Sequence, residues 1–107
     1  MAKKPETKFK EKIYPQLKSL PKSWFEKIQQ VAIRGTPDFL GVVNGIFIAL
    51  ELKVEADLEE LQRYKLKEIS NSGGVAIVVT PANWDTTYEF LHAIAIHGYD
   101  RAKEMFH

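Results

Sequence analysis

The dipeptide Asn44-Gly45, which lies between two apolar runs rich in β-branched residues, constrains the fold of this chain more than any other feature. A type I′ turn needs positive φ at both central residues, which Asn and Gly adopt readily, so the dipeptide predicts a β-hairpin. A two-residue loop also sets the register of the paired strands. We therefore expect four opposed pairs: Val43 with Ile46, Val42 with Phe47, Leu40 with Ala49, and Asp38 with Glu51.

A helix and a further strand are expected after the hairpin. Asp57, with Glu60 three residues later, fits a capping box at the start of a helix. The run 75–80 (VAIVVT) is typical of a central strand that is covered on both faces. Strand, helix and strand in this order predict a right-handed parallel crossover. The apolar face of the helix and the glycines that end it are Leu58, Leu61, Leu66 and Ile69, and Gly73-Gly74.

The flanking segments predict two more helices and one more strand. Pro5 suits the first position of a helix, which Pro15 is expected to kink or shorten and Pro21 to end. Residues 24–31 (WFEKIQQV) are expected to form a strand, and Asp85 or Thr86 to cap a last helix before a tail that runs to His107. The expected fold class is therefore α/β, in the order αβββαβα, with a small mixed β-sheet flanked by helices on both faces. The inward stripe of the first helix is Glu6, Phe9, Ile13, Leu17 and Leu20.

Composition limits the class of protein and the kinds of site. A chain of 107 residues is long enough for a single domain, 1–107, and too short for two independent cores. The absence of cysteine excludes disulfides, a thiol nucleophile and a cysteine metal site. No apolar run follows the basic N-terminus as in a signal peptide, and none approaches the roughly 18 residues of a membrane span. A soluble, cytoplasmic protein is the default expectation.

The net charge of +1 hides an uneven distribution. Residues 1–34 contain nine Lys or Arg and three Asp or Glu, whereas residues 35–107 contain six and eleven. A basic first third is suited to a polyanion, and an acidic remainder to a cation. A solvated lysine-rich helix would give the same pattern, so charge alone does not decide the function.

Asp38 and Glu51 are the main candidates for chemistry. Their expected opposition places two carboxylates on one face with β-carbons about 4.5–5.5 Å apart, where they repel each other. Lys53 projects from the same face, because it lies two residues beyond Glu51. A positive charge is therefore expected between the carboxylates, supplied by Lys53 in an ion pair with a structural role only, or by a divalent cation. Gln62 lies on the inward stripe of the following helix, so its amide is expected over the same face.

A set of oxygen ligands, without cysteine or a helical histidine pair, suits a hard cation such as Mg²⁺ or Mn²⁺. Such a cation keeps some of its waters and shares oxygens with a substrate phosphate, as phosphodiester hydrolysis requires. A lysine beside it stabilises developing charge or orients the attacking water. The residues thus favour a metal-dependent phosphodiester hydrolase.

Gly35-Thr-Pro-Asp38, Glu51-Leu-Lys53 and Gln62, in this order, resemble the PD-(D/E)XK nuclease superfamily. The chain looks most like the small VRR-NUC nucleases found in phages and in some repair proteins, from about residue 24 to 80. Glu6 and its stripe resemble the glutamate-bearing first helix of that family. The resemblance implies a restriction-endonuclease-like fold in a single VRR-NUC-like domain.

The same resemblance implies site residues. Asp38, Glu51, Lys53 and Gln62 would be catalytic, with Gln62 supporting the lysine or the metal-bound water. The cation would be held by Asp38, Glu51 and the backbone carbonyl of Leu52.

Basic and outer residues complete this expected site. Glu6 would be an outer ligand of the cation, or Glu11 if the first helix is phased differently. Lys27 and Arg34 flank the acidic residues in the sequence, so we expect them to contact DNA phosphates.

The implied activity is a Mg²⁺- or Mn²⁺-dependent DNA endonuclease that prefers branched DNA, as a Holliday-junction resolvase does. A homodimer is expected, because the chain has little core of its own and two nicks across a junction need two sites. Two alternatives stay open. One is a non-catalytic nucleic-acid-binding module that keeps the nuclease fold, and the other is a nicking or flap nuclease.

Overall fold

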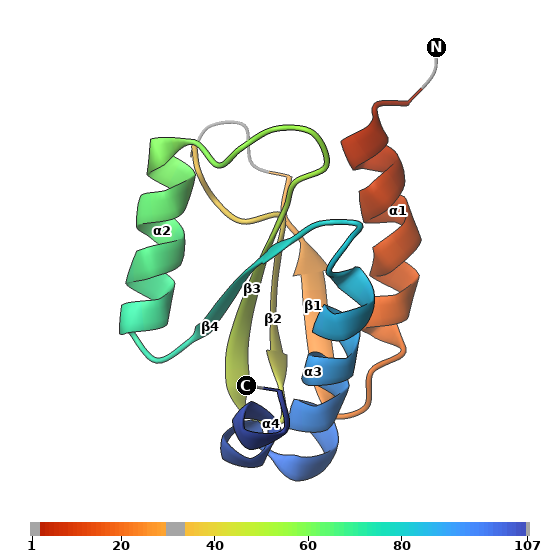
Figure 1. The fold of residues 1–107 in the computed structure, drawn as a ribbon, viewed down its shortest axis with the longest axis vertical. Helices are drawn as coiled ribbons and strands as arrows, with labels where there is room; N and C mark the ends of the chain where they lie inside the picture. The colour runs from red at the N-terminus through yellow and green to blue at the C-terminus, as the bar shows by residue number, and fades with distance from the viewer. Residues whose placement is uncertain (1–2, 30–33, 107) are drawn as a thin grey trace.

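The computed structural model describes residues 3–29 and 34–106, which form four strands and four helices (Figure 1). The strands make one mixed sheet in the order β1-β2-β3-β4, in which β1, β2 and β3 pair antiparallel and β3 and β4 pair parallel. Their bounds are Ser23–Lys27 for β1, Phe39–Val43 for β2, Ile46–Leu52 for β3 and Val75–Val79 for β4.

The hairpin that joins β2 and β3 confirms the predicted turn and register. Asn44 has a φ of 46° and Gly45 a φ of 82°, the two positive values that a type I′ turn requires. The three predicted pairs within the ladder are all observed: Val43 with Ile46, Val42 with Phe47 and Leu40 with Ala49. The ladder ends one pair short of Asp38 and Glu51, because β2 begins at Phe39.

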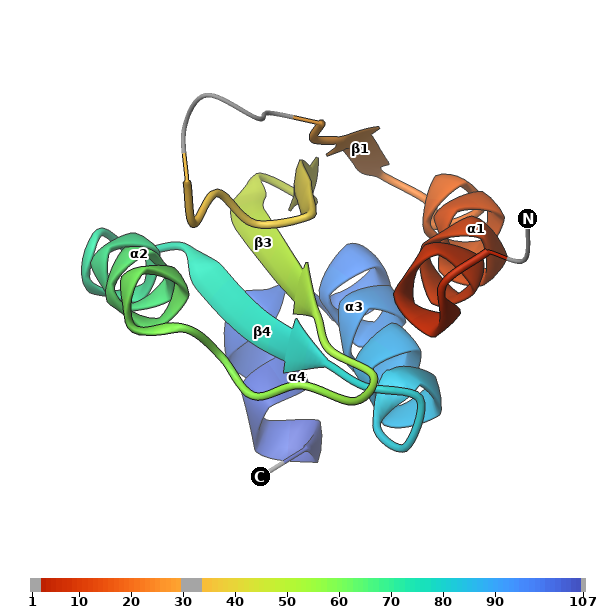
Figure 2. The same ribbon diagram turned by 90° about the horizontal axis from the view of Figure 1, so that it is seen from above.

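Helices cover both faces of the sheet, as the sequence predicted. Seen from above, α1 and α3 lie on one side of the strands and α2 lies on the other (Figure 2). The observed order αβββαβαα confirms the α/β fold class and adds one helix at the C-terminal end. The bounds are Pro5–Lys18 for α1, Glu60–Asn71 for α2, Trp84–His97 for α3 and Tyr99–Met105 for α4.

The main hydrophobic core lies between the sheet and the pair α1 and α3. Burying this apolar surface is the main favourable contribution to folding, at about 25 cal/mol for each Å² removed from water. It takes its side chains from α1, from alternate positions of β1, β2 and β3, from the two ends of β4, and from α3. Its most buried large members are Trp84, Phe39, Ile13, Leu17, Ile48, Leu50, Leu52, Leu91, Ile94, Val43 and Val79.

Two details predicted for the helices differ in the structure. Pro15 was expected to kink or shorten α1, and it does not shorten it: the helix continues to Lys18, because Pro15 lies on the exposed side where water can satisfy the carbonyl that loses its partner. Asp57 does not begin α2. Glu59 is the N-cap instead, and its backbone N–H donates to Oε1 of Gln62 at 2.9 Å, so the capping box is formed two residues further along the chain.

The position of β4 also differs from the prediction. The sequence VAIVVT predicts a central strand, but β4 pairs with β3 only and forms an edge of the sheet in the part of the chain that the structure describes. The three middle residues of β4 are only half-buried, yet its unbroken apolar run is the same as that of a central strand, so composition does not separate the two positions.

The ends of three elements depart from their expected positions. β1 covers Ser23–Lys27, and residues 30–31 of the longer predicted strand lie outside the described residues. Neither Asp85 nor Thr86 caps α3, which begins at Trp84 because that indole is buried in the core. The expected tail contains α4, whose Ala102 is buried. Its seven residues are too few for a clear periodicity.

The other face of the sheet leaves one apolar row exposed. Trp24, Val42 and Phe47 oppose one another across β1, β2 and β3, and their exposed fractions are 62, 36 and 45%. They alternate with core residues such as Phe25 and Ile48, so they point away from α1 and α3.

Candidate metal centre

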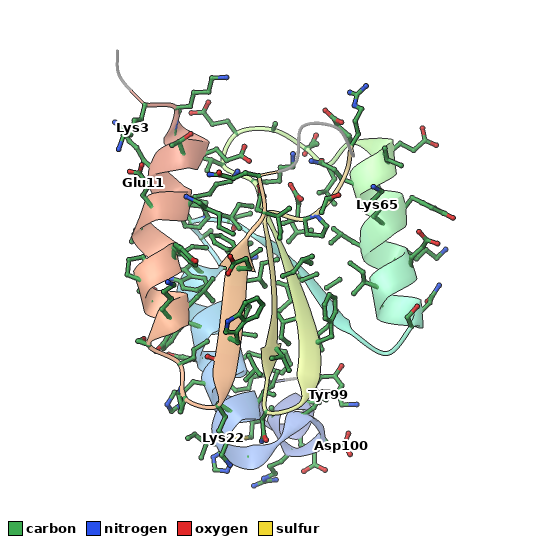
Figure 3. The ribbon with its side chains drawn as sticks, turned by 180° about the vertical axis from the view of Figure 1, so that it is seen from behind. Lys3, Glu11, Lys22, Lys65, Tyr99 and Asp100 are labelled. Atoms are coloured by element: carbon green, nitrogen blue, oxygen red, sulfur yellow. The ribbon has the colours of Figure 1, made fainter. Side chains whose placement is uncertain are left out.

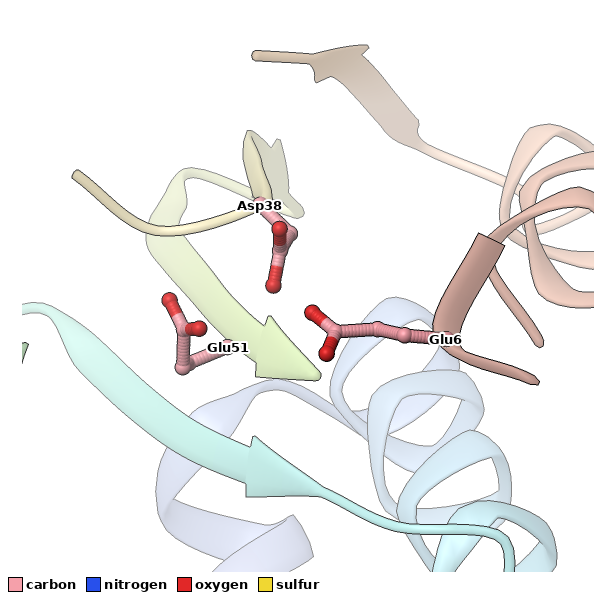
Figure 4. A group of neighbouring side chains, drawn as sticks. All are labelled: Glu6, Asp38 and Glu51. Carbon is pink, nitrogen blue, oxygen red and sulfur yellow. The ribbon is translucent and has the colours of Figure 1, made fainter. Parts of the chain in front are cut away.

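Three carboxylates from separate segments converge at one end of the sheet (Figure 4). Glu6 comes from the first turn of α1, Asp38 immediately precedes β2, and Glu51 lies near the end of β3. Each offers an oxygen, and these three oxygens all lie within 4.8 Å of one another. The convergence confirms that Asp38 and Glu51 share a face, as the hairpin register predicted.

Asp38 is held in place by the backbone around it. Its Oδ2 accepts a hydrogen bond of 2.8 Å from the N–H of Leu52, and its carbonyl accepts one of 2.8 Å from the N–H of Ile28. Asp38 therefore connects the start of β2 to both neighbouring strands. Such a carboxylate is preorganised, because the strands rather than its own flexible bonds determine its position.

Glu51 is a buried carboxyl group with an unusual titration. Only 3% of it is exposed. Burial, the nearby charge of Asp38, a hydrogen bond with Asp38 and the charge of Glu6 raise the pKa of Glu51 to about 8, against a smaller opposing effect from Lys53. The predicted repulsion between the two carboxylates is thus present, and an additional cation would relieve it.

Two ammonium groups already approach the carboxylates. Nζ of Lys53 lies 3.9 Å from Oε2 of Glu51, and Nζ of Lys10 lies 2.7 Å from Oδ1 of Asp38. The sequence predicted Lys53 at this place but did not predict the contact of Lys10 with Asp38. The available signal was its spacing, because Lys10 stands four residues after Glu6 and so shares its face of α1.

Gln62 makes the contact that its position on the helix predicted. Its Nε2 donates to Oε2 of Glu51 at 3.1 Å, and its Oε1 accepts from the N–H of Glu59 at 2.9 Å. The two bonds fix the amide orientation, since the oxygen must face the helix terminus and the nitrogen must face the carboxylate. Gln62 thereby connects α2 to the carboxylates.

The choice between Glu6 and Glu11 is resolved by the phase of α1. Glu6 joins the carboxylate group, whereas Glu11 forms an exposed ion pair with Lys3 in which Nζ lies 2.8 Å from Oε1 (Figure 3). Pro15 lies C-terminal to both glutamates and does not alter this phase.

The two expected DNA-contacting residues lie apart from each other. Lys27 on β1 faces Phe39, the neighbour of Asp38, and its Nζ lies 5.8 Å from the centre of the Tyr14 ring. Arg34 lies beside the start of α2, where its carbonyl accepts a hydrogen bond from Lys65. The backbone of Lys27 therefore lies one residue away from the position opposite Asp38. Arg34 lies on a different part of the surface, beside α2. A hollow there is lined by Arg34, Glu59, Glu60, Leu61 and Tyr64.

A groove lies directly beside the carboxylates. Its volume is about 330 Å³, and it runs between the start of α1 and the segment that follows β3. Glu6 contributes to its wall, so a ligand in the groove would lie next to the carboxylate group. The lining residues are Lys4, Pro5, Glu6, Val54, Glu55 and Ala56.

The donor set fits a small hard cation. Oxygens bound to one Mg²⁺ lie about 3–4 Å apart, because each Mg–O distance is about 2.1 Å. The three carboxylate oxygens, within 4.8 Å of one another, reach that spacing with small side-chain rotations. Leu52 lies at the same point, because its N–H bonds to Asp38, and the N–H and C=O of one strand residue point to the same side. Its carbonyl therefore remains a predicted ligand.

Comparisons of the chain with protein-family models, with curated proteins and with solved structures gave no significant match. No described helix is long and apolar enough to cross a membrane.

Proposed function

We propose that this chain is a Mg²⁺- or Mn²⁺-dependent DNA endonuclease of the PD-(D/E)XK type, similar to the VRR-NUC nucleases. The observation that carries the proposal is the convergence of Glu6, Asp38 and Glu51 within 4.8 Å, with the ammonium of Lys53 beside Glu51. Residues that are far apart in the sequence motif, from Glu6 to Lys53, therefore lie close together in the structure. Two structural ion pairs, Lys53 with Glu51 and Lys10 with Asp38, would account for two of the carboxylates and not for Glu6, which has no ion pair among the described residues.

The reaction would be an in-line displacement at a DNA phosphate. A bound divalent cation would supply Lewis-acid polarisation of the phosphate and of the attacking water. The water oxygen forms a new bond to phosphorus while the bond from phosphorus to the leaving sugar oxygen breaks. The water loses a proton to solvent, and the leaving oxygen gains one from solvent.

The residues of the chain would position and stabilise this reaction. Asp38, held by the Leu52 N–H, and Glu51, held by Gln62, would fix the cation relative to the sheet. Lys53 is only 13% exposed, so its charge is poorly screened by water and acts on the developing negative charge of the phosphate.

We propose branched DNA as the substrate and a homodimer as the active species. The described residues form one such carboxylate group, so symmetric cuts on both sides of a junction need two copies. The apolar row Trp24, Val42 and Phe47 favours a second copy as its partner, because exposed apolar patches mark association surfaces. Sedimentation of the wild type and of Trp24→Lys tests this: a dimer that the substitution dissociates supports it, and a wild-type monomer contradicts it.

A cleavage assay tests the nuclease. Labelled four-way junction, flap and plain duplex DNA are incubated with Mg²⁺, with Ca²⁺ and with EDTA, using the wild type and Asp38→Asn. Symmetric Mg²⁺-dependent cuts in the junction alone, lost in the variant, would support a resolvase. Cuts in flap or duplex DNA would retain the nuclease and discard the junction preference.

The same assay distinguishes a nuclease from a non-catalytic nucleic-acid-binding module. A binding module would bind DNA without cleaving it in Mg²⁺ or Mn²⁺, and Asp38→Asn would leave its DNA affinity unchanged. The raised pKa of Glu51 argues against it, because a module that only binds DNA gains nothing from a buried pair of repelling carboxylates.

A further inference from the structure

Lys10 is a cation that the fold itself brings to the carboxylate group. We infer that Lys10 competes with a divalent ion for Asp38 and, once that ion is bound, contacts a phosphate of the substrate. Its competition with a metal ion depends only on the carboxylates, whereas its phosphate contact rests on the nuclease function proposed above.

The geometry of Asp38 is the basis for the competition. Its Oδ2 accepts from the N–H of Leu52 at 2.8 Å, and its Oδ1 lies 2.7 Å from Nζ of Lys10. Both oxygens therefore have a partner. A divalent ion that binds Asp38 must either displace the ammonium or lie beside it, and two positive charges at that separation repel strongly.

Lys10 is the ammonium that can move. Its side chain is 28% exposed, against 13% for Lys53, and it projects from α1, the element that also supplies Glu6. A lysine side chain is long and flexible, so its Nζ can leave Asp38 without any change in the helix. Lys53 is enclosed near Glu51 and stays with the carboxylates.

The position of α1 identifies what Lys10 would contact after release. Glu6 and Lys10 are four residues apart and lie on the same face of the helix, and the groove beside the carboxylates begins at Glu6. Because Lys10 contacts Asp38, its released ammonium stays near any anion that reaches a cation held by Glu6 and Asp38. For a DNA nuclease, that anion is a backbone phosphate, which a lysine binds as a point charge.

Titration with Mn²⁺ in the absence of DNA tests the competition. The variants are Lys10→Met and, as a matched control, Lys12→Met on the exposed side of the same helix. Removing a competing ammonium is expected to tighten Mn²⁺ binding by about twofold to fivefold, the range that a partly exposed ion pair supports. Lys12→Met is expected to bind Mn²⁺ as the wild type does. Equal affinity in Lys10→Met and the wild type would overturn the inference.

Anisotropy of labelled junction DNA in Ca²⁺ tests the phosphate contact. Lys10→Met is expected to weaken DNA binding about fivefold to tenfold, more than Lys12→Met does, and Lys10→Arg is expected to retain binding because it keeps the charge. A loss no larger than that of Lys12→Met would overturn the phosphate contact.

The two results also separate this inference from the nuclease proposal. If the wild type cuts no DNA while Lys10→Met binds Mn²⁺ more tightly than the wild type does, the competition is supported and the nuclease function is contradicted. If cleavage is Mg²⁺-dependent but the Mn²⁺ affinities are equal, the nuclease stands and the role of Lys10 is wrong.

Discussion

The N–H of Leu52 donates a hydrogen bond of 2.8 Å to Oδ2 of Asp38, across the end of the β2–β3 ladder. The last backbone pair of the two strands is Phe39 with Leu50. Beyond it, the carboxylate of Asp38 accepts the hydrogen bond that a backbone carbonyl would accept in a longer ladder. The residue that would bind a cation is thus also a structural acceptor. These two roles can be separated by choosing the substitution.

Asp38→Ala and Asp38→Asn are expected to differ in stability but not in activity. Alanine leaves the Leu52 N–H without its acceptor, which costs about 1 kcal/mol or more and lowers Tm by roughly 4–8 °C. Asparagine keeps an amide oxygen for that bond and removes the charge that repels Glu51, so its Tm stays close to that of the wild type. Both variants lose Mn²⁺ binding and cleavage.

Thermal denaturation and Mn²⁺ titration of the two Asp38 variants measure these effects separately. A Tm for Asp38→Ala equal to that of Asp38→Asn would show that the Leu52 contact adds no stability. Mn²⁺ binding by Asp38→Asn at wild-type affinity would remove Asp38 from the metal centre.

Glu51 gives the protein a pH-dependent stability. Because its pKa is raised from an ordinary 4.5 to about 8 in the folded state, the folded protein binds a proton that the unfolded chain has released. The stability that this proton provides is complete below about pH 4.5 and is lost as the pH rises to 8 and above. In metal-free buffer, Tm is therefore expected to fall between pH 6 and pH 9.

Glu51→Gln removes this dependence and serves as the control. The amide is neutral at every pH, so the variant is expected to be more stable than the wild type at pH 9 by roughly 4–8 °C, the shift that about 1 kcal/mol produces in a domain of this size. Mn²⁺ should raise the Tm of the wild type more at pH 9 than at pH 6, since it no longer has to displace the proton. A wild-type Tm that rises between pH 6 and pH 9 in metal-free buffer would contradict the raised pKa.

The hairpin and the carboxylate pair that it brings together could be predicted from local rules. Asn44-Gly45 determines the turn, the turn determines the register, and the register places Asp38 and Glu51 together. Gln62 followed from helical spacing and from its position between apolar residues on one stripe. Each of these inferences needed only residues close in the sequence or joined by a two-residue loop.

Features that depend on packing between distant elements could not be predicted in this way. Lys10 reaches Asp38 only because α1 packs against the sheet, and no periodicity states which ammonium lies nearest a given carboxylate. The edge position of β4 depends on there being no further strand beside it among the described residues. The start of α3 depends on the burial of Trp84, where tertiary packing overrides the capping preference of Asp85 and Thr86.

Gln62 is expected to couple the stability of α2 to the carboxylates. Gln62→Ala removes the bond to Glu51 and the cap on the Glu59 N–H, at a cost of about 1–2 kcal/mol. Gln62→Glu keeps an oxygen for the cap but places a further carboxylate beside Glu51, so it should raise the pKa of Glu51 and move the fall in Tm to higher pH. Denaturation of both variants from pH 6 to pH 9 tests this, and identical pH profiles for Gln62→Glu and the wild type would contradict it.

Lys53 is expected to act on the chemical step rather than on metal binding. Its ammonium lies 3.9 Å from Glu51 and has little exposure to water. It is therefore expected to stabilise the negative charge that develops on a phosphate beside the cation. Lys53→Met should lower the single-turnover cleavage rate at saturating Mg²⁺ by about 10²–10³, the loss typical of one removed electrostatic contact. Mn²⁺ binding should persist, because all three carboxylates remain. Lys67→Met, an exposed lysine on α2, is the matched control and should cleave at the wild-type rate. A loss of Mn²⁺ binding in Lys53→Met large enough to account for the lower rate would make Lys53 a support for the metal centre instead of a participant in the reaction.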